Sequence, residues 1–274
     1  MIHVCYNVNA GIFRGLLMSV MSVAKHTPSP VTFHILTMDM TEADPKYAPV
    51  NEDQLGLINK VIGNYNSLSH AELVDCKPLY EKYFSGNKNS ASFYTPYAML
   101  RLFVDELALE GNPDKIIYLD ADTMCLKDIR ELWDINISRY EFGAALDAAG
   151  KLWIRSDYCN SGVMLINLPK VRKTKLLARV RDRVASKLMF MPDQSALNDF
   201  VWDKLVLPRK FNEQRSVKSD TVIKHFCRAL KFFPYPRIEG PKQWEKEKVH
   251  NILRIHSFDD IFDEIEELEK DFDI

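Results

Sequence analysis

The feature that most constrains this chain is an apolar stretch that runs directly into two carboxylates. Residues 116–119 (Ile-Ile-Tyr-Leu) follow the turn-prone segment 111–114 and precede Asp120 and Asp122. A short apolar run bounded in this way predicts a buried strand of a parallel sheet. Residues two apart in an extended chain point the same way, with Cα atoms roughly 7 Å apart. Both acids are therefore expected on one side at the carboxyl end of the strand, where open α/β sheets bind ligands.

Two neighbouring carboxylates repel each other unless positive charge lies between them. A hard divalent cation that also binds substrate phosphate oxygens would supply that charge. The alternative is that Asp120 caps a solvated turn that starts at Asp122, and for an isolated pair this is the more common outcome. The decision depends on the rest of the chain.

Composition excludes several classes of protein. The chain has 274 residues, 46% hydrophobic and 27% charged, which is typical of a globular protein with a large core. A net charge of -2 gives no general attraction to nucleic acid. Residues 1–7 are too short and mixed for a signal peptide, and we find no run of about 20 apolar residues that could cross a bilayer. The five cysteines, odd in number and without a Cys-x-x-Cys pair, predict reduced thiols and a cytoplasmic location.

Hydrophobic periodicity predicts alternating strands and helices. The expected strands are 2–8, 31–37, 116–119, 142–147, 159–167, 205–207 and 221–226. The expected helices are 11–26, 49–62, 94–109, 127–133, 169–184, 191–202 and 258–272, with a long loop at 65–95. This order predicts an α/β fold with a mostly parallel central sheet flanked by helices. The first strand is followed neither by Gly-x-Gly-x-x-Gly nor by a Walker-type loop, which argues against dinucleotide and P-loop folds.

Several motifs, in order, resemble glycosyltransferase family 8, the retaining enzymes that include glycogenin and bacterial lipopolysaccharide α-galactosyl- and α-glucosyltransferases. The resemblance covers residues 1 to about 245 and rests on five segments: Arg101-Leu, Tyr118-Leu-Asp-Ala-Asp122, Asn160-Ser-Gly-Val-Met-Leu-Ile-Asn167, Asp193-Gln-Ser-Ala-Leu-Asn198 and His225-Phe-Cys227 with Lys231. It implies a GT-A type catalytic domain over 1–245. Residues 246–274 are expected to add a C-terminal strand and an acidic helix packed on the same domain.

The resemblance also implies roles for individual residues. Asp120, Asp122 and His225 would bind a metal, Mn²⁺ in preference to Mg²⁺ because an imidazole ligand suits the later ion. Asp193 and Gln194 would be catalytic. Substrate contacts would come from a larger set, in which the uridine ligands are Tyr6 and Asn9 and the diphosphate ligand is Lys231: Tyr6, Asn9, Arg101, Ala121, Asp147, Asn160, Ser161 and Lys231. Pro241-Lys-Gln-Trp244 is a second near-match to the family's Lys-Pro-Trp, so Lys242 is a rival to Lys231.

The implied activity is transfer of glucose or galactose from a UDP-sugar to a saccharide or glycolipid acceptor, with retention at the anomeric carbon. Gln194 is an amide and a poor nucleophile, which favours a front-side path over double displacement. The basic segment 169–184 fits either a solvated helix face or an enzyme that works near the inner face of a membrane.

Two other hypotheses remain. A haloacid-dehalogenase-type phosphatase also has an acid pair after a strand, but it needs Thr or Val two residues beyond the second acid, where this chain has Met124. The other is a UDP-sugar-binding relative that has lost turnover.

Overall fold

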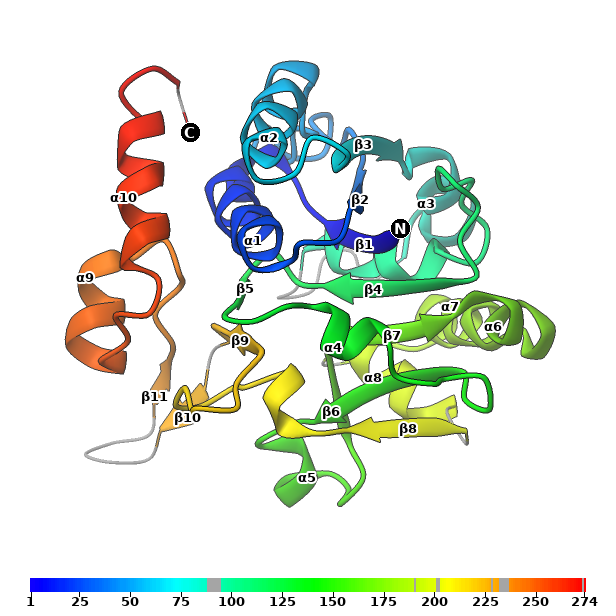
Figure 1. Cartoon of the computed structure of the whole chain (residues 1–274). Helices are drawn as coiled ribbons and strands as arrows, with labels where there is room; N and C mark the ends of the chain where they lie inside the picture. Colours follow the sequence, from blue (N-terminus) through cyan, green and yellow to red (C-terminus); the bar gives the residue numbers. More distant parts are fainter. Residues whose placement is uncertain (88–94, 190, 201–202, 228, 232–236, 273) are drawn as a thin grey trace.

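The computed structural model describes residues 1–87, 95–189, 191–200, 203–227, 229–231, 237–272 and 274, with the backbone alone at 229–231 and 237–239 (Figure 1). Its centre is a seven-stranded sheet in the order β3-β2-β1-β4-β7-β6-β8. The strands are β1 Ile2–Asn7, β2 Val31–Thr37, β3 His70–Asp75, β4 Lys115–Leu119, β6 Phe142–Leu146, β7 Cys159–Asn167 and β8 Lys204–Leu207. Strand β7 pairs antiparallel with β4 and β6, and the other neighbours pair in parallel. The prediction of a mostly parallel sheet flanked by helices is confirmed.

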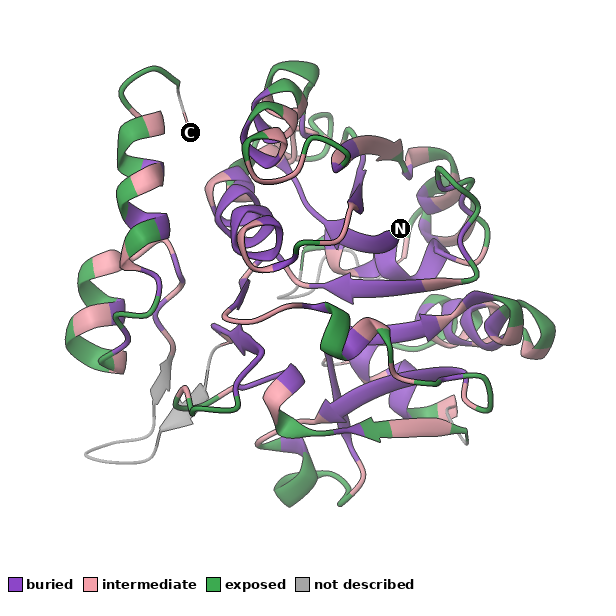
Figure 2. Cartoon of the chain, viewed as in Figure 1, coloured by how far each residue is buried: buried purple, intermediate pink, exposed green. Residues whose placement is uncertain are grey.

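Helices cover both faces of this sheet, so its central strands are buried on both sides. Every residue of β1 and β2 is buried (Figure 2), as expected for apolar strands of a parallel sheet. One face packs on α1 (Phe13–His26), α2 (Glu52–Tyr65) and α10 (Asp259–Leu268). The other face packs on α3 (Lys77–Phe84), η3 (Pro96–Phe103), α7 (Leu176–Ser186) and α8 (Pro192–Phe200). The remaining short helices are η1 Ala10–Ile12, α4 Arg130–Trp133, α5 Gly150–Trp153, α6 Leu168–Thr174 and η4 Arg209–Phe211.

Three segments differ from the sequence expectation. The long loop expected at 65–95 contains β3 and α3, and its residues 88–94 lie outside the described part. The helix expected at 94–109 is the 3-10 helix η3, which ends at Phe103. The single helix expected at 169–184 is divided into α6 and α7, because Lys175 between them has a φ of 54° and cannot continue a right-handed helix.

A two-stranded ribbon brings the C-terminal quarter to the end of β4. Strand β5 (Thr123–Cys125) follows the acid pair and pairs antiparallel with β9 (Ile223–His225), with Thr123 opposite His225. A second ribbon pairs β10 (Ala229–Lys231) with β11 (Arg237–Glu239). The ribbon β5–β9 therefore places residues about a hundred positions apart beside each other.

The described part of residues 246–274 contains short helices joined by turns. Helix α9 (Lys246–Lys248) continues into the π-helical turn η5 (Val249–Leu253), and α10 follows. The strand expected in this stretch is absent from its described residues. The expected acidic helix is α10, which lies beside α1 (Figure 1), and Lys25 of α1 forms ion pairs with Asp260 and Glu264. In the part of the chain that the structure describes, none of the helices is long and apolar enough to cross a bilayer.

Candidate functional site

Two acids and one imidazole meet at the carboxyl end of β4. Asp120, Asp122 and His225 each offer a ligand atom, and these atoms lie within 4.8 Å of one another. His225 Nε2 is 3.1 Å from Asp122 Oδ1 and 3.8 Å from Asp120 Oδ2. Neighbouring ligands of an octahedral ion with bonds of about 2.1 Å are about 3 Å apart. This set therefore fits a divalent metal, and the sequence prediction that these three residues lie together agrees with the geometry.

A glycine leaves the space between these side chains open. Gly162 lies in β7, and its carbonyl accepts a hydrogen bond from the backbone N–H of Asp120 at 2.8 Å. A Cβ atom at Gly162 would lie 2.3 Å from His225 Cε1 and 2.7 Å from Asp120 Oδ2. Real carbon atoms do not approach so closely. The backbone of β7 therefore needs glycine here for the acid and the imidazole to face each other.

A chain of side-chain amides fixes the orientation of His225. The Asp147 carboxylate can only accept, so the Asn160 Nδ2 that lies 2.9 Å away donates to it. This leaves Asn160 Oδ1 to accept from Asn212 Nδ2 at 2.9 Å, and Asn212 Oδ1 then faces His225 Nδ1 at 3.0 Å. Since Asn212 Oδ1 accepts, Nδ1 of His225 is the donor, and Nε2 is directed at the two carboxylates. Metal-binding histidines are commonly oriented by such a second hydrogen bond.

Lys242 forms an ion pair with Asp122, one of the two acids. Its Nζ donates to Asp122 Oδ2 and, at 3.2 Å, to the carbonyl of Phe226. Burial alone raises the pKa of Asp122, but the charges of His225 and Lys242 outweigh it and hold that pKa well below its usual range. The neighbouring Gln243 is fully buried and donates from Nε2 to the carbonyl of Ala121. An ammonium group on Asp122 shows that this position attracts cations.

Arg101 links the acid pair to helix α8. Its side chain is 5% exposed; Nη2 lies 2.8 Å from Asp120 Oδ1, and Nε lies 3.2 Å from Asp193 Oδ2. Nη1 donates to the carbonyl of Ser161 at 2.8 Å, and the guanidinium lies over the ring of Tyr118. Burial works against the charge of Arg101, yet Asp120, Tyr118 and Asp193 raise its pKa above the usual value. Arg101, which the resemblance placed among the substrate contacts, is therefore a buried cation directed into the site.

The start of α8 lies against the start of β7. Gln194 Oε1 accepts from the backbone N–H of Ser161 at 3.0 Å, and Gln194 Nε2 lies 3.4 Å from Asp147 Oδ2. Asp147 Oδ1 accepts from the backbone of Ala149 and Gly150 and so begins α5. Burial raises the pKa of Asp193, and Arg101 opposes that rise. Asp147, Asn160, Ser161, Asp193 and Gln194, all selected from the sequence, thus lie in one network with Arg101.

The end of β1 and the residues just after it contain two polar atoms that have no hydrogen-bond partner among the described residues. The side chains of Asn7 and Asn9 are buried, and neither Oδ1 atom has a hydrogen-bond partner. An unpaired buried carbonyl costs free energy unless a ligand or water satisfies it. This agrees with Asn9 as a ligand contact and adds Asn7, which the sequence did not single out.

The side chain of Tyr6, a residue expected to contact uridine, faces the core and not the site. Tyr6 is completely buried, and its hydroxyl lies 2.9 Å from Ser19 Oγ of α1, so its side chain is not placed to touch uridine. In a strand buried on both faces, the sequence does not reveal which residues face the ligand. Lys231 lies in β10, but its side chain lies outside the described residues. Ala121 is buried, and its carbonyl is occupied by Gln243.

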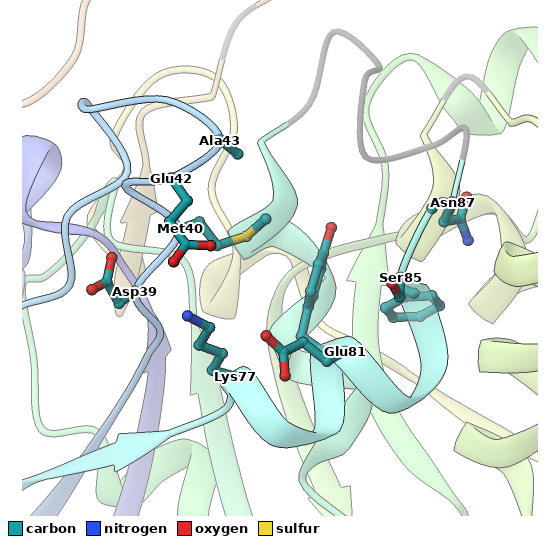
Figure 3. Close-up of a pocket in the computed structure, with 11 residues that line it drawn as sticks. Asp39, Met40, Glu42, Ala43, Lys77, Glu81, Ser85 and Asn87 are labelled. Atoms are coloured by element: carbon teal, nitrogen blue, oxygen red, sulfur yellow. The ribbon is translucent and has the colours of Figure 1, made fainter.

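A separate cavity of about 230 Å³ lies between α3 and the loop after β2 (Figure 3). Asp39, Glu42, Glu81 and Lys77 are among the residues that line it, and the lining includes none of the site residues selected from the sequence. Three carboxylates against one lysine disfavour a pyrophosphate. This cavity is therefore not the place for a nucleotide diphosphate.

Sequence comparison identifies bacterial glycosyltransferases as relatives of this chain. The chain is 28% identical to the lipopolysaccharide 1,3-galactosyltransferase of Salmonella typhimurium, over 81% of this chain and 67% of that protein. It is 27% identical to a lipopolysaccharide 1,2-glucosyltransferase of Escherichia coli, over 78% of this chain and 64% of that protein. The chain thus spans about two thirds of the length of these relatives.

Solved structures show the same fold. The galactosyltransferase LgtC in complex with donor and acceptor sugar analogues has a TM-score of 0.67 at 17% identity, covering 96% of this chain and 94% of that one. The glycosyltransferase GlyE of Streptococcus pneumoniae has a TM-score of 0.64 at 17% identity, covering 96% of this chain and 63% of that one. The model of glycosyl transferase family 8 matches residues 3–247. The chain therefore belongs to glycosyl transferase family 8.

Proposed function

We propose that the chain is a metal-dependent retaining glycosyltransferase that moves glucose or galactose from a UDP-sugar to a saccharide acceptor. The observation that carries this proposal is that Asp120, Asp122 and His225 cluster beside a buried network of carboxylate and amide groups, which are groups that can hydrogen-bond to sugar hydroxyls. The relatives named galactosyl- and glucosyltransferases support a hexose as the transferred group.

Asp120, Asp122 and His225 would hold the metal, with Mn²⁺ preferred and Mg²⁺ as second choice. One imidazole among oxygen ligands suits Mn²⁺ better than Mg²⁺. When bound, the ion supplies Lewis-acid stabilisation of the charge that develops on the leaving diphosphate. Asn212 would keep the His225 ring in the required orientation, and Gly162 would keep the space clear.

Lys242 is the lysine that we assign to the diphosphate. Its ammonium is at Asp122, where phosphate oxygens would lie next to the metal ligands. A lysine acts on a phosphate as a compact point charge. Lys231 remains the alternative, and the substitution described below distinguishes the two.

The donor sugar would contact Arg101, Asp147, Asn160, Ser161, Asp193 and Gln194. Arg101 already neutralises Asp193, which makes this carboxylate a poor nucleophile. Gln194 is held by Ser161 with its amide group near Asp147, and this favours steadying an oxocarbenium-like sugar over attacking it. Trapping a glycosyl adduct on Asp193 or Asp147 in a slowed variant would overturn this assignment.

The proposed reaction is therefore a same-face displacement. The acceptor hydroxyl attacks the anomeric carbon while the bond from that carbon to the diphosphate oxygen breaks. The hydroxyl proton passes to the departing diphosphate, and UDP leaves.

The acceptor that we propose is a glycan of the lipid-linked or surface-polysaccharide type, made at the cytoplasmic face of a membrane. The names of the relatives support this class. The basic segment of α6 and α7 supports it less than the sequence suggested, because Arg181 points inward. Arg181 Nη1 lies 2.6 Å from Asp105 Oδ1.

The two other hypotheses fare differently. Membership of family 8 gives no support to a haloacid-dehalogenase-type phosphatase. A sugar-nucleotide-binding relative without turnover has the same site and is an outcome of the test.

The test is hydrolysis and transfer with UDP-glucose and UDP-galactose, with and without Mn²⁺, in the wild type and in Asp122→Ala. We expect metal-dependent release of UDP by the wild type and its loss in Asp122→Ala. The matched control is Asp134→Ala, which removes an exposed acid that pairs with Arg130 of α4 and should keep full activity. Activity that survives in Asp122→Ala refutes the metal assignment. Binding of UDP with Mn²⁺ and no turnover with any acceptor supports the inactive relative. A thermal-shift panel of UDP-sugars reports binding independently.

A further inference from the structure

A second group of metal-binding side chains lies in the C-terminal helices, outside the site described above. It consists of His250 in η5, His256 in the following turn and Asp259 at the start of α10. His250 Nε2 lies 2.7 Å from Asp259 Oδ1, and His256 Nδ1 lies 3.4 Å from Asp259 Oδ2. One carboxylate thus receives an imidazole on each oxygen.

The backbone that brings these groups together is unusual. His250 belongs to a π-helical turn, a rare form that is frequent at functional sites. The turn ends at Arg254, whose φ of 55° is uncommon for a residue other than glycine. This reversal places the rings of His250 and His256 in a stack with centroids 4.4 Å apart. The rings of His250 and Phe262 pack edge to face with their centroids 5.7 Å apart, and this contact holds the His250 imidazole in place.

The geometry points to a bound transition-metal ion. We propose that His250, His256 and Asp259 bind Zn²⁺ or a close neighbour of it. Ligands of a tetrahedral zinc ion with bonds of about 2.0–2.1 Å lie about 3.3 Å apart. One ligand atom from each of the three side chains lies within 4.8 Å of the other two, so small side-chain shifts would complete the set. Two imidazoles with one carboxylate select zinc-like ions over Mg²⁺ or Ca²⁺. Three protein ligands leave a fourth position for water.

The surrounding charge favours a cation at this place. Six of the ten residues of α10 are acidic, which offsets the positive end of the helix dipole near Asp259. Lys246 pairs with Asp263 and Glu266, farther along the helix, and so leaves Asp259 to the histidines. The bound zinc would cross-link η5 to the start of α10. Since this segment begins just after Lys242, it would also order the chain that borders the first site.

This inference does not depend on the proposed transferase activity, and the test keeps the two sites apart. Zinc can also bind Asp120, Asp122 and His225, so the titration uses Asp122→Ala as background. Isothermal titration with ZnCl₂ should show one zinc ion per Asp122→Ala chain, and added Mg²⁺ at millimolar concentration should not displace it. The double variant Asp122→Ala/His256→Ala should bind at least tenfold more weakly. The His256 side chain is 65% exposed, so its removal should leave the fold intact.

The matched control is Asp122→Ala/His70→Ala, which removes a partly exposed histidine that also pairs with an acid, Glu110. It should bind zinc like the Asp122→Ala background. Co²⁺ gives a second readout, since its visible absorption when bound to imidazoles should disappear with His256→Ala. The single variant His256→Ala should keep Mn²⁺-dependent turnover. The proposal is overturned if the Asp122→Ala variant binds no zinc. It is also overturned if adding His256→Ala to that variant leaves the zinc isotherm unchanged.

Discussion

Asn212 Oδ1 lies 3.0 Å from His225 Nδ1, and the same amide donates to Asn160. One buried side chain therefore connects the imidazole of the metal cluster to the residues assigned to the donor sugar. The amide acts through His225 and Asn160 and is not itself assigned to the metal or the sugar, so it is a positioning residue.

We expect Asn212→Ala to weaken Mn²⁺ binding by about 10–100-fold, the usual effect of losing a hydrogen bond that orients a metal ligand. Loss of the buried hydrogen bonds should also lower the free energy of unfolding by about 1–3 kcal/mol. Metal titration and urea denaturation measure the two effects. Asn59→Ala is the matched control, because Asn59 makes two backbone hydrogen bonds to Ala71 far from the site. It should lose stability and keep metal affinity. Equal Mn²⁺ affinity in Asn212→Ala and Asn59→Ala would show that Asn212 does not position His225.

Gly162→Ala tests the space between Asp120 and His225. The added methyl would meet His225 Cε1 at 2.3 Å, so the side chains or β7 must shift. We expect a loss of about 1–3 kcal/mol in unfolding free energy, as for other overpacked sites, together with a marked loss of Mn²⁺ affinity. Gly63→Ala in α2 is the control, because a Cβ there meets nothing within 4 Å. It should stabilise the helix by about 0.5–1 kcal/mol and leave metal binding unchanged. A Gly162→Ala variant with wild-type metal affinity would contradict the interpretation.

Lys242→Ala should affect the metal and the nucleotide in opposite directions. In the free protein Lys242 occupies Asp122, so its removal frees that carboxylate and should raise the affinity for Mn²⁺ alone. The affinity for UDP in the presence of Mn²⁺ should fall, because the diphosphate loses a positive partner. Separate calorimetric titrations of Mn²⁺ and of UDP measure each effect. Lys231→Ala, the rival assignment, should change neither affinity; a larger loss of UDP affinity in Lys231→Ala would exchange the two roles.

Stability should fall in mild acid because of a histidine pair at the start of the chain. Burial, followed by the charge of His34, lowers the pKa of His3 from 6.5 to about 4, and burial also lowers the pKa of His34. Between pH 6.5 and 4 the unfolded chain binds a proton at His3 that the folded chain does not. The free energy of unfolding therefore decreases as pH falls through this window, and His3 contributes no slope above it.

The variant that checks this is His3→Gln. Its free energy of unfolding, measured by urea denaturation between pH 7.5 and 4, should change less steeply with pH than that of the wild type. Parallel pH profiles in the two proteins would show that His3 is not responsible. His3 Nδ1 lies 3.0 Å from His34 Nε2, so a moderate loss of stability at pH 7.5 is also expected.

Much of this architecture follows from the sequence, and the exceptions have physical reasons. Strand β1, helix α1, strand β2 and the acid-bearing end of β4 follow from apolar periodicity, because their burial depends on local pattern. Strand β3 was missed because its residues are mostly half-buried, with Glu72 and Asp75 among them. It lies at the edge of the sheet, where apolar residues are not required.

The site shows a similar division. Residues next to a recognisable motif, such as Arg101 and Gln194, lie in the network that the sequence indicated. Asn212 and Asn7 carry no such signal, since their roles depend on segments that meet only in the folded chain. The second near-match, Pro241-Lys-Gln-Trp244, was the available indication that this loop reaches the acids. Tyr6 shows the converse, because a motif position can face the core.

The pairing of β5 with β9 would also determine when the chain acquires the proposed metal site. Asp122 leaves the ribosome about a hundred residues before His225, and the ribbon between them forms only after both are available. A nascent chain, or one cleaved before Ile223, has the acids without the imidazole. Metal loading at the proposed site would therefore require that synthesis has passed His225, since only then can β9 pair with β5.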